Sequence, residues 1–128
     1  MAMNPVGWFE IYVQDMPRAK AFYEAVLGCQ LQPLPMPGGE QPGMEMWSFP
    51  GAMDNAGATG SLVRMPGCPS GGGGTLIYFA CEDCAEQATR AAKHGGSIHR
   101  EKFAIGPYGF IALATDTEGN MFGLHSMK

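Results

Sequence analysis

An internal repeat constrains this chain more than any other feature of its sequence. The segment YVQDMPRAKAFYEAVLG, residues 12–28, aligns with ACEDCAEQATRAAKHGG, residues 80–96, at a constant offset of 68 residues. The alignment places Asp15 on Asp83, and a glycine ends both segments. Each aspartate follows an apolar, strand-like run and suits a helix N-cap, and glycine is a common helix end. The repeat therefore predicts a duplicated strand–helix unit.

Strand-like runs complete each copy of the repeat. CQLQPL, MEMWSF and GSLVRM follow the first predicted helix, and SIHREKF, GFIALAT and NMFGLH follow the second. The 128 residues, of which 45% are hydrophobic, are enough for one domain with a packed core. The predicted fold is α+β, with two tandem β-α-β-β-β modules at about residues 5–64 and 75–127. The segment 65–74, rich in Gly and Pro, is expected to link them.

Alternation along the predicted first strands gives each of them an apolar face. On this basis we expect three side chains from each strand to pack under the following helix: Phe9, Ile11 and Val13, and by the repeat Ile77, Phe79 and Cys81. The first helix itself carries an apolar stripe, which consists of Met16, Ala19, Phe22, Tyr23 and Val26. We expect this stripe to face the core.

The CEDC stretch, from Cys81 to Cys84, has two interpretations. The repeat places Cys81 on Val13 and Cys84 on Met16, so the first half fills these positions with hydrophobic side chains. Buried cysteine behaves as a small hydrophobe, and we therefore favour a packing role. A thiol-redox protein stays the alternative, because a thioredoxin-like pair also opens a helix after a strand.

Charge and hydropathy narrow the range of partners. The formal net charge of −4, with no basic patch, argues against nucleic acid. The apolar runs are much shorter than the roughly 20 residues of a membrane-spanning helix, so no membrane association is expected. The N-terminal residues lack the basic and then apolar pattern of a signal peptide. A cytoplasmic location with free cysteines is therefore expected.

Two stretches resemble the vicinal oxygen chelate superfamily, which covers glyoxalase I, bleomycin-resistance proteins and extradiol dioxygenases. VQDMPRAKAFYEAVLG is similar to the pattern V-x-D-x-x-x-A-x-x-FY-x-x-x-LG, and DTEGNMFGLH, residues 116–125, is similar to D-P-x-G-N-x-x-x-L. The resemblance covers nearly the whole chain. It implies the glyoxalase/bleomycin resistance/dioxygenase fold, a mixed sheet that curls around a small-molecule cleft, and a homodimer.

The resemblance also implies where a metal would bind. Metal-dependent members surround a divalent ion with four inward His, Gln or Glu side chains from the first and last strands of each module. The corresponding positions in this chain are Trp8, Ser61, Leu76 and Gly123. Trp, Leu and Gly side chains carry no donor for such an ion. We therefore expect no cofactor and no metal at these positions.

Alternation then places a carboxylate on the expected cleft face, at Glu10 between Trp8 and Tyr12. His125 lies on the corresponding face of the last strand. One interpretation is an acid/base pair, with Glu10 accepting a proton and His125 or a tyrosine donating one. A second makes Glu10 and His125 ligands of a displaced metal. A third is structural, with Glu10 at a wet cleft mouth and His125 satisfied by neighbouring groups.

Two classes of function follow from this site. The first is a glyoxalase-like lyase or isomerase that uses Glu10, and with it His125, as catalytic residues. The second is a noncatalytic binding protein of the bleomycin-resistance type, which sequesters a drug or metabolite. In both classes the ligand would contact aromatic side chains, for which the candidates are Trp8, Tyr12, Tyr78 and Tyr108.

Overall fold

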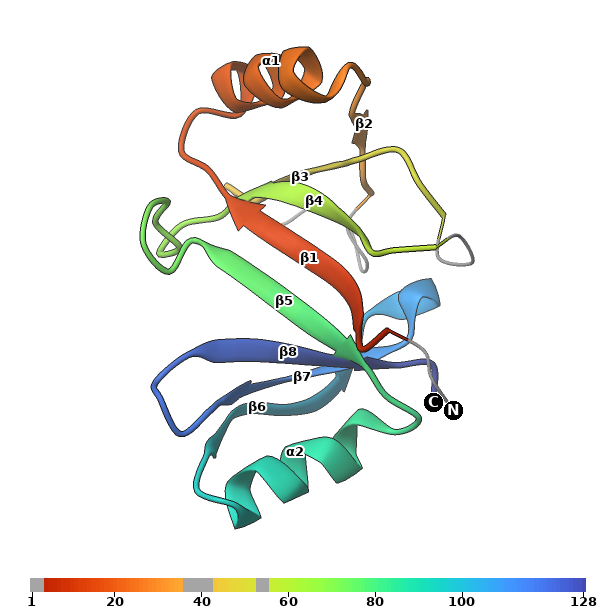
Figure 1. Ribbon diagram of the computed structural model, residues 1–128, viewed down its shortest axis with the longest axis vertical. Helices are drawn as coiled ribbons and strands as arrows, with labels where there is room; N and C mark the ends of the chain where they lie inside the picture. Colours follow the sequence, from red (N-terminus) through yellow and green to blue (C-terminus); the bar gives the residue numbers. More distant parts are fainter. Residues whose placement is uncertain (1–3, 36–42, 53–55) are drawn as a thin grey trace. The chain divides into compact units, whose positions relative to one another are not determined.

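The structure is a computed structural model that describes residues 4–35, 43–52 and 56–128. In Figure 1 the chain runs through β-α-β-β-β twice. The elements of the first pass are β1 (Val6–Tyr12), α1 (Met16–Leu27), β2 (Gln32–Pro33), β3 (Glu45–Ser48) and β4 (Thr59–Arg64). Those of the second are β5 (Thr75–Ala80), α2 (Cys84–Lys93), β6 (Ser97–Ala104), β7 (Phe110–Thr115) and β8 (Met121–Ser126). The predicted α+β class and element order are confirmed.

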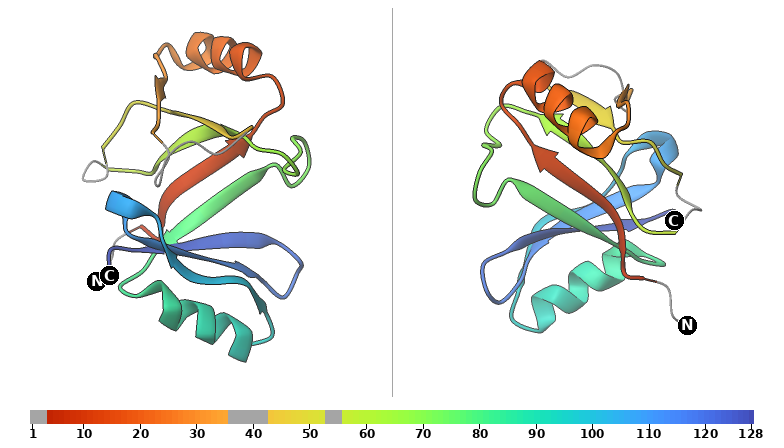
Figure 2. Two further views of the ribbon diagram at one scale, coloured as in Figure 1. Left: turned by 180° about the vertical axis from the view of Figure 1, so that it is seen from behind. Right: turned by 45° about the horizontal axis from the view of Figure 1, so that its top comes forward.

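The chain divides into two compact units. The first unit is Phe9–Thr75, and the second is Leu76–Lys128 together with the residues before Phe9. Strand β1 therefore contributes residues to both units. In each unit a helix lies against strands of the same unit, as Figure 2 shows from two further directions.

In the first unit, antiparallel pairing joins β2 to β3 and β3 to β4. Strand β1 lies beside β4, where the Val13 N–H donates to the Val63 carbonyl oxygen over 2.8 Å. The core under α1 is built around Val13, Met16, Leu31 and Leu62, with Ile11, Ala19 and Tyr23 packed against it. The ring of Phe9 contacts the ring of Phe49, which itself packs against this core.

The prediction for the α1 stripe is wrong at two positions. Phe22 and Val26 are 59% and 61% exposed, whereas Met16 is buried as expected. The buried face of α1 is narrower than the predicted stripe because Met16, Ala19 and Tyr23 already cover the strands beneath it. Leu27 is exposed as well, so α1 has an outward apolar patch of Phe22, Val26 and Leu27.

In the second unit, β5 pairs with β8 in parallel, and β7 pairs antiparallel with both β8 and β6. The sheet is therefore mixed, as predicted. The core under α2 consists of Cys84, Ala88, Ala112 and Leu124, with Phe79 and Cys81 packed against it. Ile77 was expected on this face as well, but it is 38% exposed. It lies near the start of β5 and does not belong to the α2 core.

Both helices begin at the predicted aspartates. Asp15 accepts a bond from the Arg18 N–H, and Asp83 accepts one from the Ala85 N–H. Helix α1 ends at Gly28 with φ of 63°, a left-handed conformation that glycine adopts without strain. Helix α2 ends at Lys93, three residues before the predicted glycine, and the cap is His94.

The family-like DTEGN stretch forms the turn between β7 and β8. The Asp116 carboxylate accepts bonds from the Asn120 N–H at 2.9 Å and the Glu118 N–H at 2.8 Å. These bonds, with that of the Asn120 backbone foremost, lower the pKa of Asp116. Gly119 has φ of 86°, which a side chain at this position would strain. This motif therefore has a structural role as a turn.

No helix in the described part of the chain is long and apolar enough to cross a membrane.

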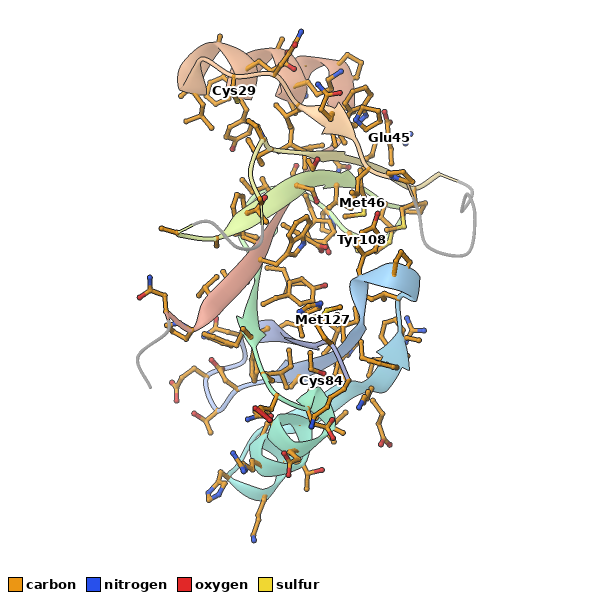
Figure 3. The ribbon with its side chains drawn as sticks, turned by 90° about the vertical axis from the view of Figure 1, so that its right-hand side faces the viewer. Cys29, Glu45, Met46, Cys84, Tyr108 and Met127 are labelled. Atoms are coloured by element: carbon orange, nitrogen blue, oxygen red, sulfur yellow. The ribbon has the colours of Figure 1, made fainter. Side chains whose placement is uncertain are left out.

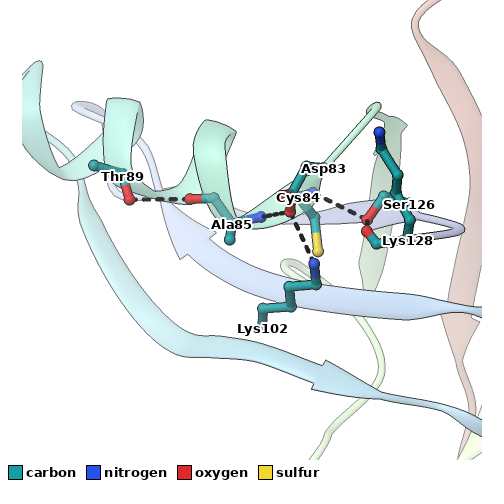
Figure 4. A network of polar contacts seen from close by, with 7 residues as sticks. All are labelled: Asp83, Cys84, Ala85, Thr89, Lys102, Ser126 and Lys128. Carbon is teal, nitrogen blue, oxygen red and sulfur yellow. Dashed lines mark hydrogen bonds and ion pairs between the residues drawn. The ribbon is translucent and has the colours of Figure 1, made fainter.

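Asp83 also forms an ion pair, drawn in Figure 4, with Lys102 Nζ at 2.9 Å. The Lys102 hydrogen bond, and after it the Ala85 N–H, lowers the pKa of Asp83. This carboxylate therefore stabilises the fold above its unfolded pKa of about 3.9, and the contribution is lost as the pH falls through the folded value.

We expect Asp83→Asn, which keeps a capping side chain, to lower stability at pH 7. The difference from wild type should shrink below about pH 4, as measured by urea unfolding.

Asp15→Asn is the matched control, because Asp15 caps α1 and forms no ion pair among the described residues. Its effect should depend less on pH. A stability difference for Asp83→Asn that stays constant down to pH 2 would show that the charge of Asp83 does not stabilise the fold.

Candidate functional site

The first unit holds a buried carboxylate on β1. Glu10 is 9% exposed, and its Oε1 accepts a hydrogen bond of 2.6 Å from the Tyr12 hydroxyl. The two side chains lie two residues apart and therefore share one face of the strand. Ile11 and Val13 point to the opposite face, toward the α1 core. The predicted alternation is thus present, and it brings Glu10 and Tyr12 together.

The neighbouring strand β4 places Ser61 beside Glu10. In the second unit the Cys81 N–H donates to the His125 carbonyl, and there Tyr78 is the Cα partner of Gly123. The equivalent bond in the first unit runs from Val13 to Val63, so the repeat makes Glu10 the partner of Ser61.

A second observation agrees with this register. A Cβ built on Gly60 would meet the backbone and ring of Phe9, so the residues that precede Ser61 and Glu10 are also neighbours. Glu10 and Ser61 are thus adjacent across parallel strands, which lie about 4.8 Å apart, and their side chains point to the same face.

Ser61 is a polar side chain of this face that is buried without a hydrogen bond. It is 0% exposed, and its Oγ has no hydrogen-bond partner among the residues that the structure describes. By contrast, Ser126 is equally buried but has two partners, the Cys84 N–H and the Lys128 carbonyl (Figure 4). The sequence singled out position 61 only as a metal-ligand position; the hydroxyl as a possible binding group was missed.

In the second unit an aromatic ring occupies the equivalent place. Tyr78 is buried and lies over Gly123, its partner on β8. A Cβ built on Gly123 would lie 2.8 Å from Tyr78 Cγ and closer still to two other ring atoms. Position 123 thus has no room for a larger side chain while Tyr78 keeps this position.

His125 and Tyr108 are brought together in the second unit. His125 Nε2 lies 2.6 Å from the Tyr108 carbonyl oxygen, which can only accept, so Nε2 carries a hydrogen and donates it. Tyr108 lies on the 3-10 turn Gly106–Tyr108, labelled in Figure 3, and is 38% exposed. Glu10 and Tyr12 belong to the first unit and the other candidates to the second. The pairing of Glu10 with His125 therefore stays a prediction.

The residues at positions 8, 61, 76 and 123, where the resemblance places the family's metal ligands, do not form a suitable ligand set for a divalent ion. Trp8, Leu76 and Gly123 offer no oxygen donor or imidazole, which leaves the single hydroxyl of Ser61. The packing of Tyr78 on Gly123 adds a steric obstacle at one of these positions. Among the described residues, no group of three or more His, Cys, Asp or Glu side chains is arranged to hold a metal.

The CEDC cysteines are packed in the α2 core. Cys84 is fully buried at the start of α2, on the side that faces the sheet (Figure 3), and Cys81 packs against the same core. Burial raises the pKa of the Cys81 thiol, and the nearby Cys84 adds to the shift. A raised pKa disfavours the reactive thiolate, so this environment agrees with a packing role.

A hollow of about 300 Å³ lies at the end of β4 in the first unit. Its polar side chains include Arg64 and Gln14, and residues 65–69 form the rest of its wall. Arg64 Nη2 pairs with Glu45 Oε1 at 3.4 Å, and both side chains are well exposed. Because an exposed ion pair already engages this cation, the buried Glu10 face is the stronger candidate site.

Comparison with known proteins identifies the family to which this chain belongs. Residues 6–124 match the family described as Glyoxalase/Bleomycin resistance protein/Dioxygenase superfamily. The match covers most of the chain, and the protein belongs to this superfamily. No curated protein matches the chain.

Solved structures share the fold at low sequence identity. A variant of methylmalonyl-CoA epimerase from Streptomyces coelicolor, with 2-nitronate-propionyl-CoA, is 16% identical with a TM-score of 0.69, over 98% of this chain and 95% of that one. The epimerase from Mycobacterium tuberculosis is 16% identical with a TM-score of 0.66, over 98% and 89%. A hypothetical protein from Bacillus halodurans is 14% identical with a TM-score of 0.68, over 96% and 94%. At these identities the likeness concerns the fold alone.

The contact between Tyr78 and Gly123 predicts a steric cost for any side chain at position 123. We expect Gly123→Ala to lower the free energy of unfolding by about 1–3 kcal/mol, because the added methyl group overpacks the ring. Chemical denaturation of the variant measures this loss. The same substitution should cost less in a Tyr78→Ala background, where the ring is gone.

Gly72→Ala is the control, since a Cβ there meets nothing within 4 Å and Gly72 has no positive φ. It should change stability by less than about 0.5 kcal/mol. An equal cost of Gly123→Ala with and without Tyr78 would contradict the packing described above.

Proposed function

We propose that the protein binds a small, partly apolar carbonyl compound at the Glu10 face and acts on it as a lyase or isomerase, with Glu10 as acid/base. The hydrogen bond between the buried Glu10 carboxylate and the Tyr12 hydroxyl is the observation that carries this proposal. A carboxylate on a buried strand face is costly unless it is well solvated by the protein or serves a ligand.

The pair supplies the two groups that proton transfer needs. In the proposed reaction a Glu10 oxygen accepts the proton from the carbon next to the carbonyl. The electrons of the C–H bond then form the carbon–carbon double bond of an enolate, and the carbonyl electrons move to its oxygen. Protonation of that carbon from its other face, by a donor other than Glu10, completes an isomerisation, whereas loss of a leaving group from the next carbon completes a lyase reaction. Tyr12 is the proposed proton donor, and a part for His125 stays a prediction from the sequence.

The proposal does without the metal of the metal-dependent relatives. The residues at positions 8, 76 and 123 support a reaction without metal, because their side chains carry no ligand atoms for a divalent ion. Methylmalonyl-CoA epimerase, by its name, inverts a carbon next to a carbonyl group, so proton transfer at such a carbon is within reach of this fold. We propose the same type of chemistry here without proposing the same substrate.

A noncatalytic binding protein is the second candidate. It is favoured by the same lack of metal donors and by the aromatic side chains Trp8, Tyr78 and Tyr108, which would contact a ligand without reacting with it. In that case ligands would stabilise the fold but would not be turned over.

We also propose a homodimer in the cytoplasm. The outward patch on α1, Phe22, Val26 and Leu27, offers apolar surface for a second copy. The four cysteines are free thiols, which agrees with a reducing compartment.

Exchange of carbon-bound protons tests the proposed acid/base role of Glu10. Wild-type protein in D₂O should incorporate deuterium into hydroxyacetone, methylmalonyl-CoA or both, at the carbon next to the carbonyl, as followed by NMR. Glu10→Gln should slow this exchange by roughly 10²–10⁴-fold, because the amide cannot accept the proton. Tyr12→Phe should slow it by roughly 10-fold through the lost hydrogen bond.

Glu45→Gln is the control, since Glu45 is a half-exposed carboxylate in the same unit. It should leave the exchange rate unchanged. Ligand-induced stabilisation with no exchange would favour the binding protein, and equal exchange by wild type and Glu10→Gln would remove Glu10 from the mechanism.

A further inference from the structure

Ser61 has a property that the proposed role of Glu10 does not explain. Its hydroxyl is fully buried, yet Oγ forms no hydrogen bond with any residue that the structure describes. A buried polar group without a partner destabilises a fold, so such groups are rare and often have a function. The adjoining buried side chains of β4, Leu62 and Val63, are apolar, so an alanine here would satisfy packing alone.

We propose that the Ser61 hydroxyl donates a hydrogen bond to the carbonyl oxygen of the ligand whose neighbouring carbon faces Glu10. This inference rests on the proposed function and assigns a binding group to the same site. The family resemblance aligns position 61 with one of those at which metal-dependent members hold their ion. In this chain a neutral hydroxyl would take over the task of polarising the carbonyl.

The geometry supports a shared ligand. Glu10 and Ser61 are partners on adjacent parallel strands, and their side chains point to one face. A carbonyl oxygen and the carbon that loses its proton are separated by only two bonds. Because Ser61 is 0% exposed, a ligand that contacts both groups must displace the side chains that now cover Oγ. The equivalent pair in the second unit, Tyr78 and Gly123, carries no such combination because the ring lies on the glycine.

The chemistry assigns a distinct task to each group. When Glu10 accepts the proton, negative charge develops on the carbonyl oxygen as the enolate forms. A hydroxyl already aimed at that oxygen stabilises this charge more than it stabilises the neutral ligand. The Ser61 proton stays on Oγ throughout, and Glu10 or Tyr12 returns a proton to carbon.

Ser61→Ala separates the effect on folding from the effect on the reaction. Without ligand, the variant should have a Tm higher by roughly 2–6 °C, because it removes a buried hydroxyl that lacks a partner. Ser126→Ala is the matched control. Its hydroxyl is equally buried but has two partners, so this substitution should lower the Tm.

The exchange assay with hydroxyacetone and methylmalonyl-CoA then tests the reaction. Ser61→Ala should lower kcat for deuterium incorporation by roughly 100-fold, with a smaller change in KM, since the hydrogen bond is strongest to the enolate. Ser61→Cys, whose thiol is larger than the hydroxyl and a weak donor, should fall between wild type and Ser61→Ala.

Each outcome bears on one proposal or on both. Unchanged exchange by Ser61→Ala, together with loss of exchange in Glu10→Gln, would overturn the role of Ser61 and leave that of Glu10. A lower Tm for Ser61→Ala would also overturn it, because the hydroxyl would then have a partner in the free protein. Failure of wild-type protein to bind or exchange either compound would contradict both proposals.

Discussion

Packing of each helix on one face of a strand determines which side chains remain for a ligand. Helix α1 covers the face of β1 that carries Ile11 and Val13, and α2 covers the face of β5 that carries Phe79 and Cys81. Because strand side chains alternate, the residues between them must point the other way. Glu10 and Tyr12 therefore lie on the face of β1 that α1 does not cover, as a direct consequence of the apolar core.

The two modules have diverged on that second face. In the second unit, Tyr78 lies over Gly123, so an aromatic ring replaces any polar group from β8. In the first unit, the corresponding positions hold Glu10 and Ser61, a carboxylate and a hydroxyl. The duplication keeps the order of helix and strands, whereas the pair of a carboxylate and a hydroxyl occurs at these positions in one module. In our account, this polar pair replaces the metal as the means of activating a carbonyl compound.

The sequence predicted those parts of the structure that local patterns determine. Asp15 and Asp83 start the helices because capping depends on neighbouring residues, and the offset of 68 located the equivalent strands. The sequence did not predict that Phe22 and Ile77 are exposed. The spacing of apolar residues shows which side chains share a face of a helix or strand, but not how much of that face its neighbour covers. The bond between Tyr12 and Glu10, and the isolation of Ser61 Oγ, depend on the register of β1 with β4 and on side-chain rotamers. The sequence pattern does not encode these directly.

The central claim is that this member of the superfamily works through Glu10 and Ser61 without a bound metal. The most direct test is the metal content of the purified protein, by elemental analysis after incubation with Ni²⁺, Zn²⁺, Mn²⁺ and Fe²⁺ and removal of loosely bound ions. We expect a negligible amount of tightly bound metal. Close to one equivalent per chain would contradict this proposal and would make Glu10 the first candidate for a metal ligand.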